Sequence, residues 1–182
     1  AYAQVLDGVA DLMPRMYLYH IPQISGVGLT PRVIRTLKDR YPRSIVGVKD
    51  SGCDTAFSLS LADAFMPGLT IYVGNEPDLP ALGRRGSKGA VSGLANFMPR
   101  LVHRLVLSPD AAETPAERER VLALLAVLTR YALLPAIKGM MSILSGDPAW
   151  LRVRPPLMAL TDTEFTQLNQ QVQGLGLTHL TR

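Results

Sequence analysis

The feature that most constrains the fold is a short apolar run followed by a helical pattern, which occurs four times in succession. The apolar runs, each predicted to be a strand, cover residues 15–20, 44–49, 69–73 and 89–93. Units of this kind, about 20–30 residues long, predict a parallel sheet with right-handed crossovers. Such a sheet is either open and doubly wound or part of a closed barrel, and both make this an α/β protein.

The remainder of the chain predicts helices rather than strands. The expected helices are 117–134, a continuation from the interruption at Pro135 to about Leu144, and 161–174. Thr161 and Glu164 stand three residues apart ahead of an apolar pattern, which is the spacing of a capping box. We therefore expect three packing helices after the strand–helix units.

Composition and charge exclude several classes of protein. The chain is 47% hydrophobic and 19% charged, an ordinary globular composition, and no apolar run reaches the ~18 residues of a membrane span. Residues 1–4 lack the pattern of a signal peptide, and a single cysteine, Cys53, fits a reducing compartment, so a cytoplasmic location is expected. The net charge of +4 comes from scattered basic residues without interleaved aromatics, which argues against nucleic-acid binding.

Common site motifs are absent from the sequence. No G-x-G-x-x-G follows a predicted strand, so a dinucleotide site is not expected. His20, His103 and His179 share no metal-ligand spacing with Cys53, so no metal site is expected either. No G-x-S-x-G motif indicates a serine nucleophile.

Chemically useful residues stand where the predicted strands end. Tyr19 ends the first strand, Lys49 the second, and Glu76 follows the third. Because the carboxyl ends of parallel strands share one edge, these side chains are expected on a common rim. Desolvation beside an apolar strand favours the neutral amine that a lysine nucleophile needs. The alternative is a strand-ending lysine whose head reaches water and a tyrosine that only fills the core.

Four segments together carry a specific resemblance. They are L-Y-H-I-P at 18–22, G-V-K-D-S at 47–51, G-N-E at 74–76 and G-A-V-S-G-L-A-N at 89–96. In order and spacing they resemble the dihydrodipicolinate synthase / N-acetylneuraminate lyase family, over nearly all of the chain. The resemblance implies a (β/α)8 TIM barrel with three extra C-terminal helices. Residues 1–108 would be the second half of the barrel, roughly strands 5–8, and residues 109–182 the helical extension.

The resemblance also implies roles for individual residues. Lys49 would form a Schiff base with the keto carbon of pyruvate or another 2-keto acid, with no further cofactor, and Tyr19 would relay protons. Substrate would be bound by Gly74, Asn75, Glu76, Val91 and Ser92. The backbone near Gly74 and Val91 would border the pyruvyl part, and Asn75 and Glu76 would hold substrate hydroxyls.

Departures from the family pattern bear on the substrate. Ile24 stands about where the synthases place an arginine for the carboxylate of aspartate semialdehyde, and His20 replaces the family's usual asparagine. An isoleucine cannot make that bidentate contact. The upstream half of the barrel, with the G-T-T-G-E-type loop that holds the substrate carboxylate, has no counterpart in this sequence.

Two classes of function follow from these observations. The first is a class I (Schiff-base) pyruvate-dependent aldolase or lyase acting on a 2-keto-3-deoxy sugar acid or a related 2-keto acid, with an aldehyde as the other small-molecule partner. The dihydrodipicolinate-forming condensation is the alternative within this class. The second is a non-catalytic fragment or binding module that keeps the lysine. The resemblance further implies a homo-oligomer, and neither a nucleic acid nor a membrane is expected as a partner.

Overall fold

The structure is a computed structural model that describes residues 1–177 and divides into two compact units. The first unit comprises Ala1–Val91 with Val106–Pro109, and the second comprises Ser92–Leu105 with Asp110–Arg182. The predicted boundary between residues 108 and 109 stays a prediction.

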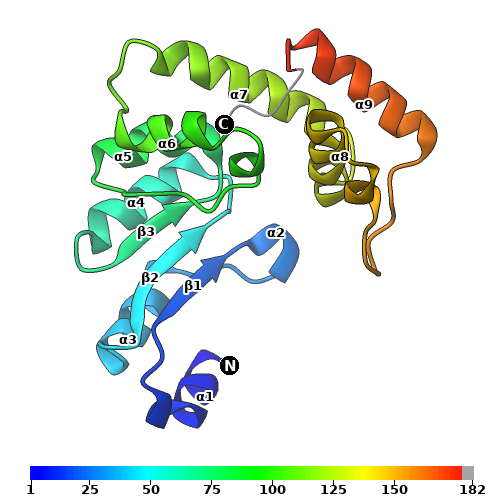
Figure 1. The fold of residues 1–182 in the computed structure, drawn as a ribbon. Helices are drawn as coiled ribbons and strands as arrows, with labels where there is room; N and C mark the ends of the chain where they lie inside the picture. Colours follow the sequence, from blue (N-terminus) through cyan, green and yellow to red (C-terminus); the bar gives the residue numbers. More distant parts are fainter. Residues whose placement is uncertain (178–182) are drawn as a thin grey trace. The chain divides into compact units, whose positions relative to one another are not determined.

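The first unit alternates strands and helices (Figure 1). Its elements are α1 (Tyr2–Gly8), η1 (Ala10–Leu12), β1 (Met16–His20), α2 (Pro22–Ser25), α3 (Pro31–Arg40), β2 (Ile45–Asp50), α4 (Thr55–Phe65), β3 (Thr70–Val73), η2 (Glu76–Asp78) and α5 (Leu79–Arg84). The helices α3 and α4 begin at caps visible in the sequence, because the side chain of Thr30 accepts a hydrogen bond from Val33 N–H and that of Asp54 one from Phe57 N–H.

The strands form a parallel sheet in the order β1-β2-β3, as the strand–helix pattern predicts. Figure 1 shows the three strands side by side with their carboxyl ends toward the same edge. The register places Leu18 opposite Val48 and Val48 opposite Ile71, and it places Tyr19 opposite Lys49. Tyrosine and lysine therefore occupy neighbouring strands at the same level.

The two faces of the sheet have opposite character. Leu18, Val48 and Ile71 share one face, are 0% exposed, and belong to the same core cluster as apolar residues of α3 and α4. The other face carries Tyr17 and Tyr19, which are 42% and 41% exposed. Side chains alternate between the two faces along a strand. Because the first set is buried in the core, the second set, which includes Lys49, lies on the opposite face of the sheet.

A prediction at the sheet edge was wrong. Residues 89–93 do not form a strand, and within residues 1–177 this segment pairs with the sheet only through an isolated bridge between Ala90 and Val73. Gly89 and Gly93 have no side chains to pack, and ordering a glycine in an extended segment costs more conformational entropy than ordering other residues. Because β3 is the only strand beside this segment in the described residues, we infer that the segment makes too few hydrogen bonds and packing contacts to form a fourth strand of the sheet.

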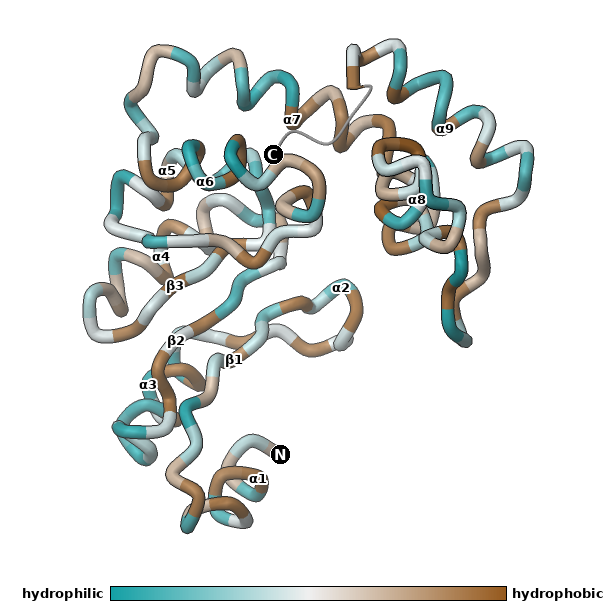
Figure 2. The backbone as a smooth tube through the Cα atoms, viewed as in Figure 1, coloured by the Kyte–Doolittle hydropathy of each residue, from teal (hydrophilic) through white to brown (hydrophobic). Residues whose placement is uncertain are grey.

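The second unit is helical. It contains η3 (Leu94–Asn96), α6 (Pro99–Leu107, with its last two residues in the first unit), α7 (Thr114–Leu128), α8 (Leu133–Ser145), η4 (Pro148–Leu151) and α9 (Asp162–Gly174). Figure 2 shows α8 coloured mainly as hydrophobic, and its buried residues include Met140 and Leu144. Within the described residues no single helix is long and apolar enough to cross a membrane, and only α7 and α8 taken together, bent by 113°, pass that test.

Two predictions for these helices have different outcomes. The capping box that opens α9 is confirmed, since Thr161 N–H donates to Glu164 Oε2 at 2.8 Å and Glu164 N–H donates to Thr161 Oγ1 at 3.2 Å. The interruption predicted at Pro135 was placed wrongly, because the helical path breaks before Leu133 and Pro135 is the third residue of α8. In the first turn a proline costs little, since the N–H groups there have no partner within the helix.

Replacement of Gly47 by alanine is expected to destabilise the sheet. A Cβ at this position would overlap the carbonyl oxygen of Thr70 and the ring of Tyr17, which crosses the glycine to stack on Tyr72 with ring centroids 5.5 Å apart. We expect the free energy of unfolding to fall by about 1–3 kcal/mol, as for other overpacked sites. Denaturant unfolding measures it, and Gly8→Ala, with no atom within 4 Å of its Cβ, is the control. Equal losses in both variants would contradict the prediction.

Candidate active site

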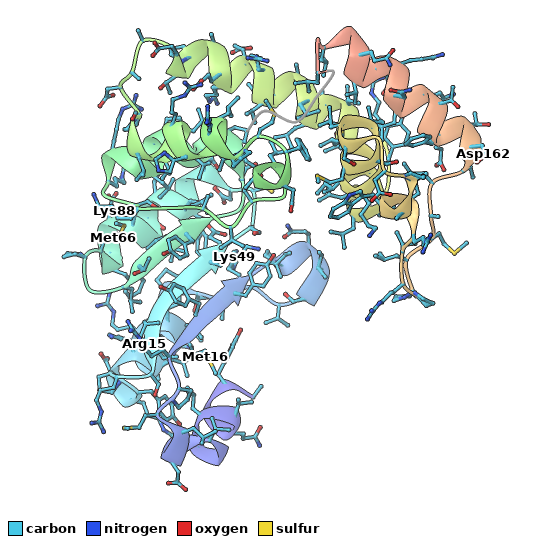
Figure 3. All side chains as sticks on the ribbon, in the orientation of Figure 1. Arg15, Met16, Lys49, Met66, Lys88 and Asp162 are labelled. Carbon is cyan, nitrogen blue, oxygen red and sulfur yellow. The ribbon has the colours of Figure 1, made fainter. Side chains whose placement is uncertain are left out.

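The centre of the candidate site is a contact between a lysine and a tyrosine. Lys49 Nζ donates a hydrogen bond to Tyr19 Oη at 3.0 Å and lies 4.2 Å from the centroid of the same ring. The contact follows from the strand register, which pairs the two residues directly and points both side chains to the exposed face. Figure 3 shows Lys49 near the carboxyl end of β2. An amine and a phenol are thus held within the distance of a single proton transfer.

The lysine changes the acidity of the tyrosine. Burial alone would raise the pKa of Tyr19, but its side-chain hydrogen bonds with Lys49 and Ser51 and the positive charge of Lys49 outweigh that effect and lower the pKa. The lowered pKa means that these interactions stabilise the phenolate form, which can accept a proton from a neighbouring ammonium group.

Tyr19 is expected to ionise at a lower pH than the other perturbed tyrosines. Burial raises the pKa of Tyr41, assisted by its hydrogen bond with Asp7, and burial beside Tyr17 raises the pKa of Tyr72. In a spectrophotometric titration of tyrosinate we expect one phenolate to form below the usual pKa of 10.0 and Tyr19→Phe to remove it. Tyr41→Phe is the control, since it should remove absorbance only at the alkaline end. If Tyr19→Phe removed only late-titrating absorbance, the prediction would be wrong.

Ser51 belongs to the site although it was not among the predicted site residues. Its hydroxyl hydrogen-bonds with Tyr19 and lies where a side chain at Gly74 would begin. A Cβ on Gly74 would overlap Ser51 Oγ and come within 3.4 Å of Lys49 Cε. Glycine at 74 therefore leaves space for both the serine and the lysine, and the place of Ser51 two residues after Lys49 was the available sequence signal.

A buried carboxylate fixes the turn that follows the lysine. Asp50 is 1% exposed, its Oδ1 accepts from Gly52 N–H at 2.8 Å and its Oδ2 accepts from the hydroxyl of Ser58 at 2.6 Å. Ser51 N–H in turn donates to the carbonyl of His20 at 2.8 Å. These bonds join the ends of β1 and β2 behind the lysine, and buried hydrogen-bonded carboxylates of this kind hold backbone geometry rigidly.

The loop between β1 and α3 is attached to the site at two points. His20, 8% exposed, accepts a hydrogen bond at Nδ1 from Leu29 N–H at 2.9 Å, and its ring centroid lies 4.6 Å from that of Phe57. The amide of Gln23 in α2 donates to the carbonyl of Ser51 at 2.6 Å. His20, in the place of the family's asparagine, is therefore a buried hydrogen-bond acceptor that holds the loop.

Acidic and amide side chains gather after β3. The amide of Asn75 and the hydroxyl of Thr55 each donate to the Asp78 carboxylate at 2.7 Å, and Glu76 is 5% exposed. Burial raises the pKa of the Cys53 thiol, and the negative charges of Asp78, Asp50 and Glu76 raise it further. Cys53 is therefore a poor thiolate nucleophile.

Val91 and Ser92, the two other residues predicted to bind substrate, lie outside the strands of the sheet. Val91 follows the Ala90 bridge and is 49% exposed. Ser92 lies in the second unit, where its hydroxyl accepts a hydrogen bond from Ala95 N–H at 3.3 Å. Contacts in the structure join Lys49 and Tyr19 directly and place Gly74 beside Lys49.

Nowhere in residues 1–177 do three or more His, Cys, Asp or Glu side chains form a group able to hold a metal ion.

Comparison with known proteins identifies related chains. The family model described as "Dihydrodipicolinate synthetase family" matches residues 2–175. An uncharacterized DapA-like lyase of Chloroflexus aurantiacus is 29% identical over 92% of this chain and 56% of its own. The protein YagE of Escherichia coli, provisionally named a 2-dehydro-3-deoxy-D-gluconate aldolase, is 28% identical over 97% of this chain and 59% of its own.

Solved structures show the same relationship. The structure of YagE in complex with pyruvate superposes with a TM-score of 0.83 at 25% identity, covering 97% of this chain and 60% of YagE. Dihydrodipicolinate synthase from Agrobacterium tumefaciens superposes with a TM-score of 0.79 at 29% identity, covering 89% of this chain and 54% of that one. The chain therefore spans somewhat more than half the length of these relatives.

Proposed function

The chain belongs to the dihydrodipicolinate synthetase family, and we propose that it carries a Schiff-base site for pyruvate or another 2-keto acid on Lys49. The observation that carries the proposal is the 3.0 Å hydrogen bond between Lys49 Nζ and Tyr19 Oη at the carboxyl ends of two parallel strands. Chemistry in folds of this class is concentrated at that edge of the sheet. The pyruvate bound to YagE supports the choice of ligand.

The proposed reaction begins with attack by the neutral amine of Lys49 on the keto carbon. Tyr19 donates a proton to the oxygen of the resulting carbinolamine, water leaves, and an imine forms between Lys49 Nζ and the former keto carbon. The protonated imine then accepts the electron pair of the carbon–carbon bond one carbon removed, so that an enamine forms and an aldehyde departs. Tyr19 takes the hydroxyl proton released at that aldehyde. Protonation of the enamine and hydrolysis of the imine return pyruvate and the free lysine.

We propose a 2-keto-3-deoxy sugar acid as the substrate. Ile24 carries no hydrogen-bond donor, so it cannot make a bidentate contact with a second carboxylate, whereas the side-chain oxygen of Asn75 is an acceptor for a substrate hydroxyl. Glu76 is 5% exposed and therefore presents little surface to a substrate. The aldolase name of YagE supports this substrate class. The condensation of pyruvate with aspartate semialdehyde is the second candidate, favoured by the similarity to the Agrobacterium tumefaciens synthase.

The proposal extends to the whole protein. In a (β/α)8 barrel, β1, β2 and β3 would be strands five to seven, residues 89–93 would occupy the eighth position, and α7, α8 and α9 would be the C-terminal extension. We further propose a homo-oligomer and a cytoplasmic location, as the family resemblance implies. The competing function is a binding module that retains the lysine without turnover.

Trapping with borohydride tests the proposed function. The chain is incubated with pyruvate and borohydride, and peptide mass spectrometry is used to find the reduced adduct on the peptide that contains Lys49. Release of pyruvate from a 2-keto-3-deoxy sugar acid, compared with product formation from aspartate semialdehyde, separates the two enzymatic candidates. An adduct without turnover of either substrate would support the binding module, and absence of any adduct at Lys49 would refute the Schiff-base site.

A further inference from the structure

A second concave site lies at the amino ends of the strands. Figure 3 shows Arg15 and Met16 at the start of β1, and Lys49 toward the opposite end of the neighbouring strand. A cavity of about 460 Å³ is present here, between the α1–η1 segment and the residues that lead into β1 and β2. We propose that this cavity binds a small phosphate ester, with Arg15 and Arg43 holding the phosphate and the α1–η1 segment contacting an apolar body.

Two of the arginines that line the cavity, Arg15 and Arg43, belong to backbone segments that lie side by side. Arg15 immediately precedes β1 and Arg43 lies two residues before β2. Met16 N–H donates to the carbonyl of Ser44 at 2.7 Å, so the two segments run side by side at this point. Neither guanidinium forms a side-chain hydrogen bond or an ion pair within residues 1–177. Two cations without acidic partners on adjacent segments repel each other, and a bound anion would relieve that repulsion.

A third arginine, Arg40, also lines the cavity and is paired with a carboxylate. Arg40 Nη2 contacts Asp7 Oδ2 at 2.9 Å, and Tyr41 donates to the other oxygen of the same carboxylate at 2.6 Å. Among the residues that line the cavity and their ion-pair partner Asp7, three guanidinium groups stand against one carboxylate, an excess of two positive charges. A phosphate monoester carries about −1.5 to −2 charge near neutral pH, which matches this excess. Arginine also presents paired N–H groups that suit phosphate oxygens.

Part of the cavity lining is apolar. It is formed by Leu6, Ala10 and Met13, and Met13 is 70% exposed. Met13 adopts a left-handed backbone conformation with φ of 44°, which ends η1 and turns the chain into β1. An exposed methionine adapts its shape to an apolar surface. The cavity therefore combines a cationic side with an apolar side, which fits a phosphate ester better than inorganic phosphate.

Calorimetric titration of the full 182-residue chain with phenyl phosphate tests the proposal. We expect saturable binding that is tighter than binding of inorganic phosphate, and none with phenol. Loss of the two charged contacts in Arg15→Ala/Arg43→Ala should weaken binding by about tenfold or more. Arg100→Ala, an exposed arginine of α6, and Lys49→Ala are the controls and should bind as the parent chain does.

A second variant covers the case in which the double substitution disturbs folding. Met13→Glu places a carboxylate on the exposed apolar side, so it should abolish binding by repulsion while both arginines remain. Far-ultraviolet circular dichroism shows whether each variant is folded. The proposal is overturned if phenyl phosphate does not saturate, if inorganic phosphate binds equally well, or if folded Met13→Glu binds unchanged. It is also overturned if Lys49→Ala removes binding, since the phosphate would then occupy the candidate active site.

Discussion

Replacing Lys49 with alanine is expected to abolish the borohydride-trapped pyruvate adduct completely. The imine needs a primary amine at the position opposite Tyr19, and the register of β1 and β2 brings no other lysine to that level. Loss of the nucleophile removes the covalent pathway rather than slowing one step of it, so this is the largest effect that we expect. Intact-mass measurement after reduction gives the result directly.

Two further substitutions make the Lys49 test specific. Lys49→Arg keeps a positive charge but cannot form an imine, so it should also fail to trap pyruvate. Lys88→Ala removes an exposed lysine and should leave trapping unchanged, which controls for adducts formed at random on surface amines. An adduct that persists in folded Lys49→Ala, or disappears in Lys88→Ala, would assign the chemistry to a different lysine.

Replacing Tyr19 with phenylalanine is expected to slow turnover by roughly 10²–10⁴-fold, the usual contribution of a positioned proton donor and acceptor. Slow trapping of pyruvate should survive, because Lys49 remains while proton transfer to the carbinolamine oxygen is lost. The comparison of trapping with steady-state turnover therefore separates the two residues. Equal loss of both would mean that the hydroxyl is needed to build the site rather than to move protons.

The pH dependence gives a second measure of Tyr19. Its pKa lies below the usual value, so the phenolate forms at a lower pH than in free tyrosine. Where turnover needs the protonated phenol, the rate should fall on the alkaline side as pH rises through that lowered pKa. Tyr19→Phe should lose this descending limb, whereas Tyr41→Phe should keep it. A descending limb that remained in Tyr19→Phe would assign it to another group.

The sheet and the central pair could be predicted because each depends on local patterns. Apolar runs and caps such as Thr30 and Asp54 define where the strands and helices begin, and parallel order then brings Tyr19 and Lys49 to one edge. Helix caps act through hydrogen bonds two or three residues away, so they can be recognised in sequence.

Other parts of the site could not be predicted because they depend on distant contacts. The position of Ser51 two residues after Lys49 places it near the site, but its hydrogen bond with Tyr19 depends on the turn that follows β2. The acceptor role of His20 depends on a backbone N–H nine residues later, at Leu29, and no residue pattern encodes that bond. The apolar pattern of residues 89–93 predicts a strand, but strand formation also needs neighbours that a sequence pattern does not specify.

The two attachment points of the β1–α3 loop have a consequence for laboratory evolution of the site. The bonds from Gln23 to Ser51 and from Leu29 to His20 fix the ends of a segment that carries the exposed Ile24. On the proposed aldolase function, random substitution at Ile24 is expected to change the preference for the aldehyde without displacing Lys49. Libraries that also vary Gln23 or His20 would lose these hydrogen bonds and are expected to lower the proposed activity in most clones. The chain thus separates positions that can diversify from positions that must be kept.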